Sequence, residues 1–98
     1  MTVKFIALIT VKDPDKIAAY RAVAGDALAK HDGKVIAGLP NPEILESAQE
    51  SPTIAAILEF PAAENARAWR QDTELQDVHA MRNAAGLSTI LALPDFPA

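Results

Sequence analysis

The residues best suited to proton transfer or anion binding are one carboxylate, Glu59, and two basic side chains, His79 and Arg82. Glu59 lies near the end of an otherwise apolar run, just before Pro61. If it faces a cavity, burial raises the pKa of its carboxyl group and suits it to act as a catalytic acid or base. Alternatively, Glu59 is a charge that emerges at the margin of a sheet. Glu59 is therefore the candidate catalytic residue, with the second interpretation left open.

Arg82 is the candidate for holding an anionic or carbonyl group. It lies four residues after Val78, on the apolar stripe of a predicted helix. A buried arginine needs a partner, and the sequence offers Glu59 or Glu46 for an ion pair that would be purely structural. His79 is one helical turn from Arg82 and could join it, although we expect a partly exposed position for His79.

Three further side chains are candidate ligand-binding residues, each with a structural alternative. Tyr20 lies on the apolar stripe of the first predicted helix, where a core aromatic ring can reach the rim with its hydroxyl. Trp69 would anchor the second predicted helix to the sheet, or form a stacking wall for a ligand. Glu46 either contacts a ligand or is an edge-strand charge that blocks sheet extension.

Several kinds of chemistry find no support in the sequence. The chain has no cysteine, and its two histidines, His31 and His79, have no carboxylate three or four residues away, so we expect no metal site. His31 is expected at a helix end with a structural or surface role. No serine lies in a Gly-x-Ser-x-Gly elbow, and no glycine-rich phosphate loop is present, so we expect no cofactor.

Charge and length limit the possible partners. Thirteen acidic against nine basic residues give a net charge of −4, which disfavours nucleic acid and anionic membranes. The apolar run at residues 5–11 is too short for a membrane span and lacks a signal-peptide cleavage site, so a cytoplasmic protein is expected. With 98 residues, the chain should form a single domain over residues 1–98.

The hydrophobic pattern predicts strands separated by helices. Asp13-Pro14 is a helix start and Gly33 a helix stop, while Gly25 within that helix suggests a bend or a close backbone contact. Thr73 and Gln76 have the spacing of a capping box. The predicted strands are residues 3–11, 34–38, 53–60 and 88–93, with extended structure also at 43–47; the predicted helices are residues 14–32, 62–71 and 74–85.

This order predicts an α+β fold, with right-handed crossovers that place the helices on one face of an antiparallel sheet. An antiparallel strand with one wet face should alternate between apolar and polar residues. The central residues of the segments 3–11 and 53–60 are instead apolar in both alternating sets. We therefore expect a second copy of the chain to cover the free face, giving a sheet-to-sheet homodimer.

Several short motifs in register resemble the DUF1330 family, small bacterial proteins of unknown function. The segments are Asp13-Pro14, Ala19-Tyr20-Arg21-Ala22, Ala29-Lys30-His31-Asp32-Gly33-Lys34, Glu43-Ile44-Leu45-Glu46, Glu59-Phe60-Pro61, Ala66-Arg67-Ala68-Trp69 and Arg82-Asn83-Ala84-Ala85. The resemblance implies a ferredoxin-like βαββαβ fold of the dimeric α/β-barrel superfamily, which includes monooxygenase-like and isomerase-like proteins. This chain departs from the family pattern at Asp32, at Leu75 in place of a tyrosine, and at Ala62 in place of a helix-capping serine.

Two hypotheses follow. In the first, the protein binds a small anionic or carbonyl metabolite in a partly apolar pocket between sheet and helices. It would then be either a binding protein or a cofactor-free monooxygenase- or isomerase-like enzyme. In the second, it is a non-enzymatic homodimer whose polar cluster only holds helix to sheet. The position of Glu59 and Arg82 relative to a cavity distinguishes them.

Overall fold

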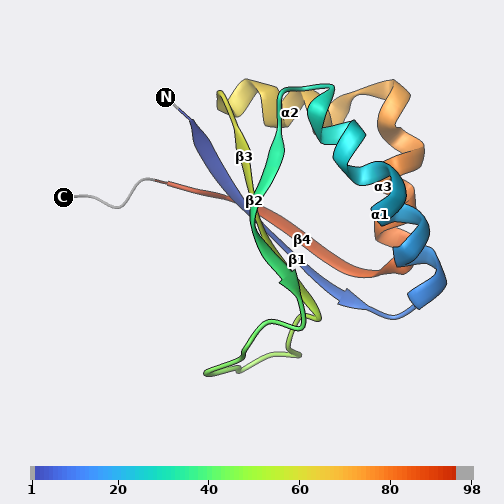
Figure 1. Ribbon diagram of the computed structural model, residues 1–98, viewed down its shortest axis with the longest axis vertical. Coiled ribbons are helices and arrows are strands. Elements are labelled where there is room, and N and C mark those ends of the chain that lie inside the picture. The colour runs from blue at the N-terminus through green and yellow to red at the C-terminus, as the bar shows by residue number, and fades with distance from the viewer. Residues whose placement is uncertain (1, 95–98) are drawn as a thin grey trace.

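The apolar segments pair into an antiparallel sheet. The computed structural model describes residues 2–94. In chain order the elements are β1 (Val3–Val11), α1 (Pro14–Ala29), β2 (Lys34–Pro40), β3 (Ile54–Phe60), α2 (Ala63–Gln71), the short 3₁₀ helix η1 (Thr73–Leu75), α3 (Gln76–Ala85) and β4 (Gly86–Leu93). The four strands lie in the order β2-β3-β1-β4, all neighbours antiparallel. The helices cover one face of the sheet (Figure 1). The predicted ferredoxin-like α+β fold is confirmed.

Helix α1 begins as predicted but ends differently. The side chain of Asp13 accepts hydrogen bonds from the backbone N–H groups of Asp15 and Lys16, each at 3.1 Å. At the other end Asp32, not Gly33, takes the left-handed conformation, with φ 63°. Gly33 is needed for space, because a Cβ there would collide with the Phe60 ring.

The predicted capping box of Thr73 and Gln76 is not formed. Asp72 is the cap instead, because its Oδ1 accepts a hydrogen bond from the N–H of Glu74 at 2.8 Å. Gln76 donates to the backbone carbonyl of Asp72 at 2.9 Å. Asp72 also holds the end of α1, through an ion pair with Lys30 and a hydrogen bond with the His31 ring, each at 2.8 Å. These contacts hold the pKa of the Asp72 carboxyl group well below its usual range, the Lys30 bond having the largest effect.

The connection between β2 and β3 contains no strand, so the extended structure predicted at residues 43–47 is absent. This connection extends beyond the sheet (Figure 1). Thr53 fixes its end to β1: its hydroxyl accepts from the N–H of Val11 at 2.8 Å and donates to the carbonyl of Ile9 at 3.1 Å. The N–H of Thr53 donates to the same carbonyl at 2.9 Å.

The strand register separates two apolar faces. One face packs under the helices; Ala7, Ile9, Leu58 and Phe60 belong to its buried core. On the other face Ile6 pairs with Ile57 and Leu91. The helices of the described residues lie on the opposite side of the sheet (Figure 1). Leu87 is 60% exposed and Leu91 43% exposed on this free face. The predicted second apolar face of the sheet is therefore present in the structure.

Within residues 2–94, no helix combines the length and apolar character needed to span a bilayer. The same residues contain no cluster of three or more histidine and carboxylate side chains placed to hold a metal ion.

Candidate functional site

Helix α3 carries Arg82 into the interior between the helices and the sheet. Arg82 is only 2% exposed. Its Nη1 donates a 2.9 Å hydrogen bond to Nδ1 of His79. The guanidinium carbon lies 5.3 Å from the centre of the Trp69 ring and 5.6 Å from that of Tyr20. Two aromatic rings and a histidine thus surround a buried cation.

No carboxylate within the described part of the chain forms an ion pair with Arg82. The predicted pairing with Glu59 or Glu46 is wrong. Glu59 lies on the free face of the sheet, where its carboxylate is 3.9 Å from Lys4 and 3.8 Å from Lys34. Its neighbours Leu58 and Phe60 point the other way, into the core. The prediction that Glu59 faces the cavity is therefore also wrong, because strand alternation turns it away.

His79 is fully buried at 1% exposure, so the prediction of a partly exposed position is wrong. Its Nε2 donates to the carbonyl oxygen of Trp69 at 2.9 Å, because that oxygen can only accept. Its Nδ1 must then accept from Arg82, which can only donate. Because Nδ1 accepts a hydrogen bond, the imidazole of His79 is neutral. Burial lowers the pKa of His79, and the charges of Arg82 and Arg70 lower it further, against the opposing effect of the Trp69 hydrogen bond.

Trp69 anchors α2 to the core, as predicted. The ring is 3% exposed and packs edge-on against His79 and at a tilt against Phe60, with centroid distances of 4.7 and 5.9 Å. Its Nε1 has no hydrogen-bond partner, and neither has Nε of Arg82. Buried N–H groups are almost always paired. Two buried donors on adjacent side chains therefore lack the partner that such groups normally have.

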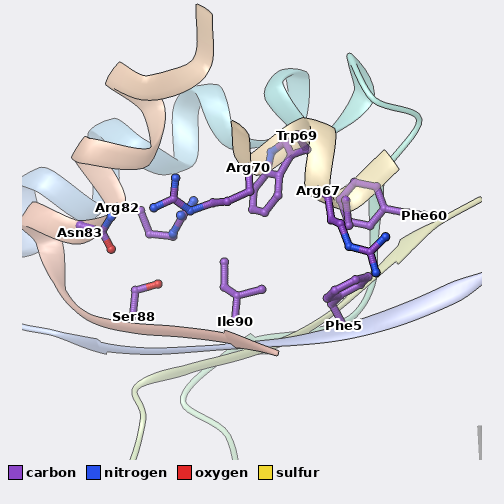
Figure 2. A pocket seen from close by; sticks show the side chains of 10 residues that line it. Phe5, Phe60, Arg67, Trp69, Arg70, Arg82, Asn83, Ser88 and Ile90 are labelled. Carbon is purple, nitrogen blue, oxygen red and sulfur yellow. The ribbon is translucent and has the colours of Figure 1, made fainter. Parts of the chain in front are cut away.

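A cavity of about 280 Å³, here called the arginine cavity, lies against these two side chains (Figure 2). Its walls come from α2, α3, β1, β3 and β4: Phe5, Phe60, Ala66, Arg67, Trp69, Arg70, Arg82, Asn83, Ser88 and Ile90. Arg82, Asn83 and Ser88 gather at one end, and Phe5 and Phe60 stand at the other (Figure 2). The lining contains three arginines and no carboxylate.

A second cavity, of about 270 Å³, lies under α1 and is here called the α1 cavity. It shares Trp69, Arg82 and Ile90 with the arginine cavity. Its remaining walls are largely apolar: Ala7, Ile9, Ile17, Tyr20, Arg21, Ala24, Gly25, Leu28, Val35, Gly38, Pro40, Ile54, Ala56 and Leu58. Arg82 thus stands at the boundary between a polar and an apolar compartment.

The structure brings together four of the six predicted site residues: Tyr20, Trp69, His79 and Arg82. Glu59 is on the other side of the sheet, and Glu46 is exposed in the β2–β3 connection and lines neither of these two cavities. Four further polar residues of the arginine cavity were not predicted from the sequence: Arg67, Arg70, Asn83 and Ser88. Ser88 and Ile90 are two residues apart on β4, so strand alternation could have placed both on the same face of the sheet.

Comparison with known proteins agrees with this architecture. The family model "Domain of unknown function (DUF1330)" matches residues 3–95. The chain belongs to the DUF1330 family. No protein of curated function matches it.

Solved structures similar to this DUF1330 protein share its fold at low sequence identity. A protein of unknown function from Rhodopseudomonas palustris is 21% identical, with a TM-score of 0.75 over 98% of this chain and 84% of its own. A dimeric ferredoxin-like protein of unknown function from Jannaschia sp. CCS1 is 13% identical, with a TM-score of 0.74 over 97% and 100%. SnoaB, a cofactor-independent oxygenase from Streptomyces nogalater, is 13% identical, with a TM-score of 0.70 over 99% and 95%.

Proposed function

We propose that this DUF1330 protein binds a small organic anion, such as a carboxylate or an enolate, in the arginine cavity. The observation that carries the proposal is the buried guanidinium of Arg82, which has a neutral histidine and two aromatic rings around it but no carboxylate. A buried charge without a counter-ion is costly. An anionic ligand would supply the missing charge.

The surrounding groups support an anion with an apolar body. Arg70 adds a second positive charge near His79, and the unpaired Nε1 of Trp69 adds a neutral donor beside Arg82. Guanidinium groups bind carboxylates through strong charge-assisted hydrogen bonds. Phe5 and Phe60, at the far end of the cavity, suit a planar or apolar ligand body.

Oxygenase-like turnover of the bound anion is a second candidate, because SnoaB has this fold and a site that stabilises an organic anion favours its ionised, reactive form. Isomerisation has less support. It needs a base, yet no carboxylate lines the cavity and both ring nitrogens of His79 are engaged. Oxygen consumption in the presence of a bound enolate would test the oxygenase candidate directly.

Titration with benzoate and its neutral analogue benzamide tests the binding proposal. We expect benzoate to raise the melting temperature and benzamide to have little effect. Replacing Arg82 with methionine should weaken benzoate binding tenfold or more. This factor corresponds roughly to the free energy that one hydrogen bond to a charged group contributes. Lys16→Met, which removes an exposed charge from α1, is the control. If benzoate and other small carboxylates fail to bind the wild-type protein, the cluster of Arg82 and His79 is purely structural.

We also propose that the free face of the sheet is the interface of a homodimer. Leucine side chains exposed on β4 and the uncovered Ile6 and Ile57 support it. The structurally similar Jannaschia protein is described as dimeric. A second copy of the same face would bury these side chains and stabilise both protomers.

A further inference from the structure

Helix α1 contains a glycine, Gly25, that its packing does not require. A Cβ at Gly25 would meet no atom within 4 Å, whereas one at Gly33, Gly38 or Gly86 would collide with a neighbour. The predicted close backbone contact at Gly25 is therefore wrong. Glycine inside a helix costs about 1 kcal/mol relative to alanine. Position 25 thus lowers the stability of α1 without any packing gain.

Gly25 forms part of the wall of the α1 cavity. The lining residues Ile9, Leu28 and Leu58 are buried and form the floor of this cavity. Gly25 and Val35 are exposed, so they lie where the cavity opens, between α1 and β2. A side chain at position 25 would occupy space at this mouth.

The α1 cavity adjoins the proposed anion site, and the side chains of Trp69 and Arg82 line both cavities. A ligand whose anionic group binds Arg82 can therefore extend its apolar part under α1. An apolar cavity of about 150 Å³ suffices for benzene. The α1 cavity, at about 270 Å³, has room for a body larger than one ring.

We propose that the α1 cavity holds the apolar chain of an amphipathic monocarboxylate, and that Gly25 determines specificity by keeping the mouth of this cavity open. The inference rests on the proposed function, because Arg82 must bind the carboxylate. Arg21, one turn before Gly25, also lines the cavity and places a positive charge where an anion would approach.

The test compares decanoate with benzoate, which fits within the arginine cavity alone. In the wild-type protein, straight-chain carboxylates should bind more tightly with length, by up to about fourfold for each buried methylene group. Gly25→Leu should weaken decanoate binding at least tenfold, leave benzoate binding unchanged, and leave the melting temperature equal or higher. Ala24→Leu, which narrows the same cavity from the next position, should also weaken decanoate binding. Ala18→Leu adds the same bulk on an exposed part of α1 and is the matched control.

The outcomes separate the two proposals. If benzoate does not bind the wild-type protein, the proposed function fails and this inference fails with it. If benzoate binds but decanoate binds no more tightly, or Gly25→Leu binds decanoate like the wild type, only the role of the α1 cavity is overturned. Gly25→Ala should raise the melting temperature, and a decrease would show that the helix needs glycine for packing.

Discussion

Arg82 donates a 2.9 Å hydrogen bond to His79, and neither side chain is more than 2% exposed. The carbonyl of Trp69 accepts from the other ring nitrogen of His79, so the chain of contacts runs from α2 through α3 to the guanidinium. This chain fixes the guanidinium in position, and its buried Nε has no hydrogen-bond partner within the described residues. The pair therefore both holds the helices together and presents a charge to the cavity.

The first prediction concerns the stability of Arg82→Met without ligand. Arg82→Met removes a buried charge that has no carboxylate partner, which should increase the free energy of unfolding. This gain should offset the loss of the hydrogen bond to His79, since apolar replacements of buried charged groups are often neutral or stabilising. We expect the free energy of unfolding, measured in urea, to change by less than about 1.5 kcal/mol. A much larger loss would mean that the guanidinium is needed for folding, and the anion proposal would lose its main support.

The second prediction concerns pH. Folding lowers the pKa of His79, so below the ordinary histidine value of about 6.5 the unfolded chain takes up the proton that the folded chain resists. The stability that His79 contributes is present above this pH and is lost as the pH falls toward its folded pKa. Urea unfolding between pH 7.5 and 5 should show a decline of at most about 1.4 kcal/mol per pH unit.

His79→Gln should remove most of this decline, because glutamine cannot be protonated in that range. His31→Gln is the matched control: it removes the other histidine, which pairs with Asp72, and leaves His79 buried. An equally steep decline in His79→Gln would assign the pH dependence to another group.

The third prediction concerns Thr53, whose hydroxyl bridges the start of β3 to the backbone of β1. Thr53→Val keeps the shape of the side chain but removes both hydrogen bonds of the hydroxyl. We expect a loss of about 1–2 kcal/mol in the free energy of unfolding. Thr53→Ser retains the hydroxyl and should keep most of the stability, so an equal loss in both variants would assign the effect to the methyl group.

The fourth prediction tests the homodimer by sedimentation at micromolar concentration. The wild-type protein should sediment at twice the mass of the chain. Leu91→Asp places a charge in the middle of the free apolar face and should give a monomer. Val23→Glu changes an exposed aliphatic residue on the helical layer and should remain a dimer. A wild-type protein of monomer mass would contradict the proposed interface.

Local chemistry explains why the order of elements could be predicted. The Asp13 cap and Pro14 start α1 through contacts within the first turn, so neighbouring residues suffice to identify them. It was harder to predict from the sequence which residue caps the helical segment that follows α2. Asp72 and Thr73 both have side chains that can cap a helix. Asp72 is the cap in the structure, where it also binds Lys30 and His31 at the end of α1.

The candidate site was only partly predictable for a similar reason. His79 lies four residues after Leu75 and three before Arg82, so the helical period does place all three on one stripe. The width of that stripe depends on what packs against it, and Trp69 of α2 covers His79. The residue pattern of α3 alone does not indicate that Trp69 packs on His79.

The sequence by itself determined that β1 and β3 have two apolar faces, that helices alternate with them in a ferredoxin-like order, and that an arginine lies on a buried stripe. Alternation assigns each strand residue to one of two sets, but it does not say which set the helices cover. Only the tertiary structure decided that Glu59 lies on the free face with Lys4 and Lys34, while Arg82 is buried beside two cavities without a carboxylate. The physical reason is that side chains point to the two faces of a strand with the same two-residue spacing. The two faces differ only because helices from distant parts of the chain pack on one of them.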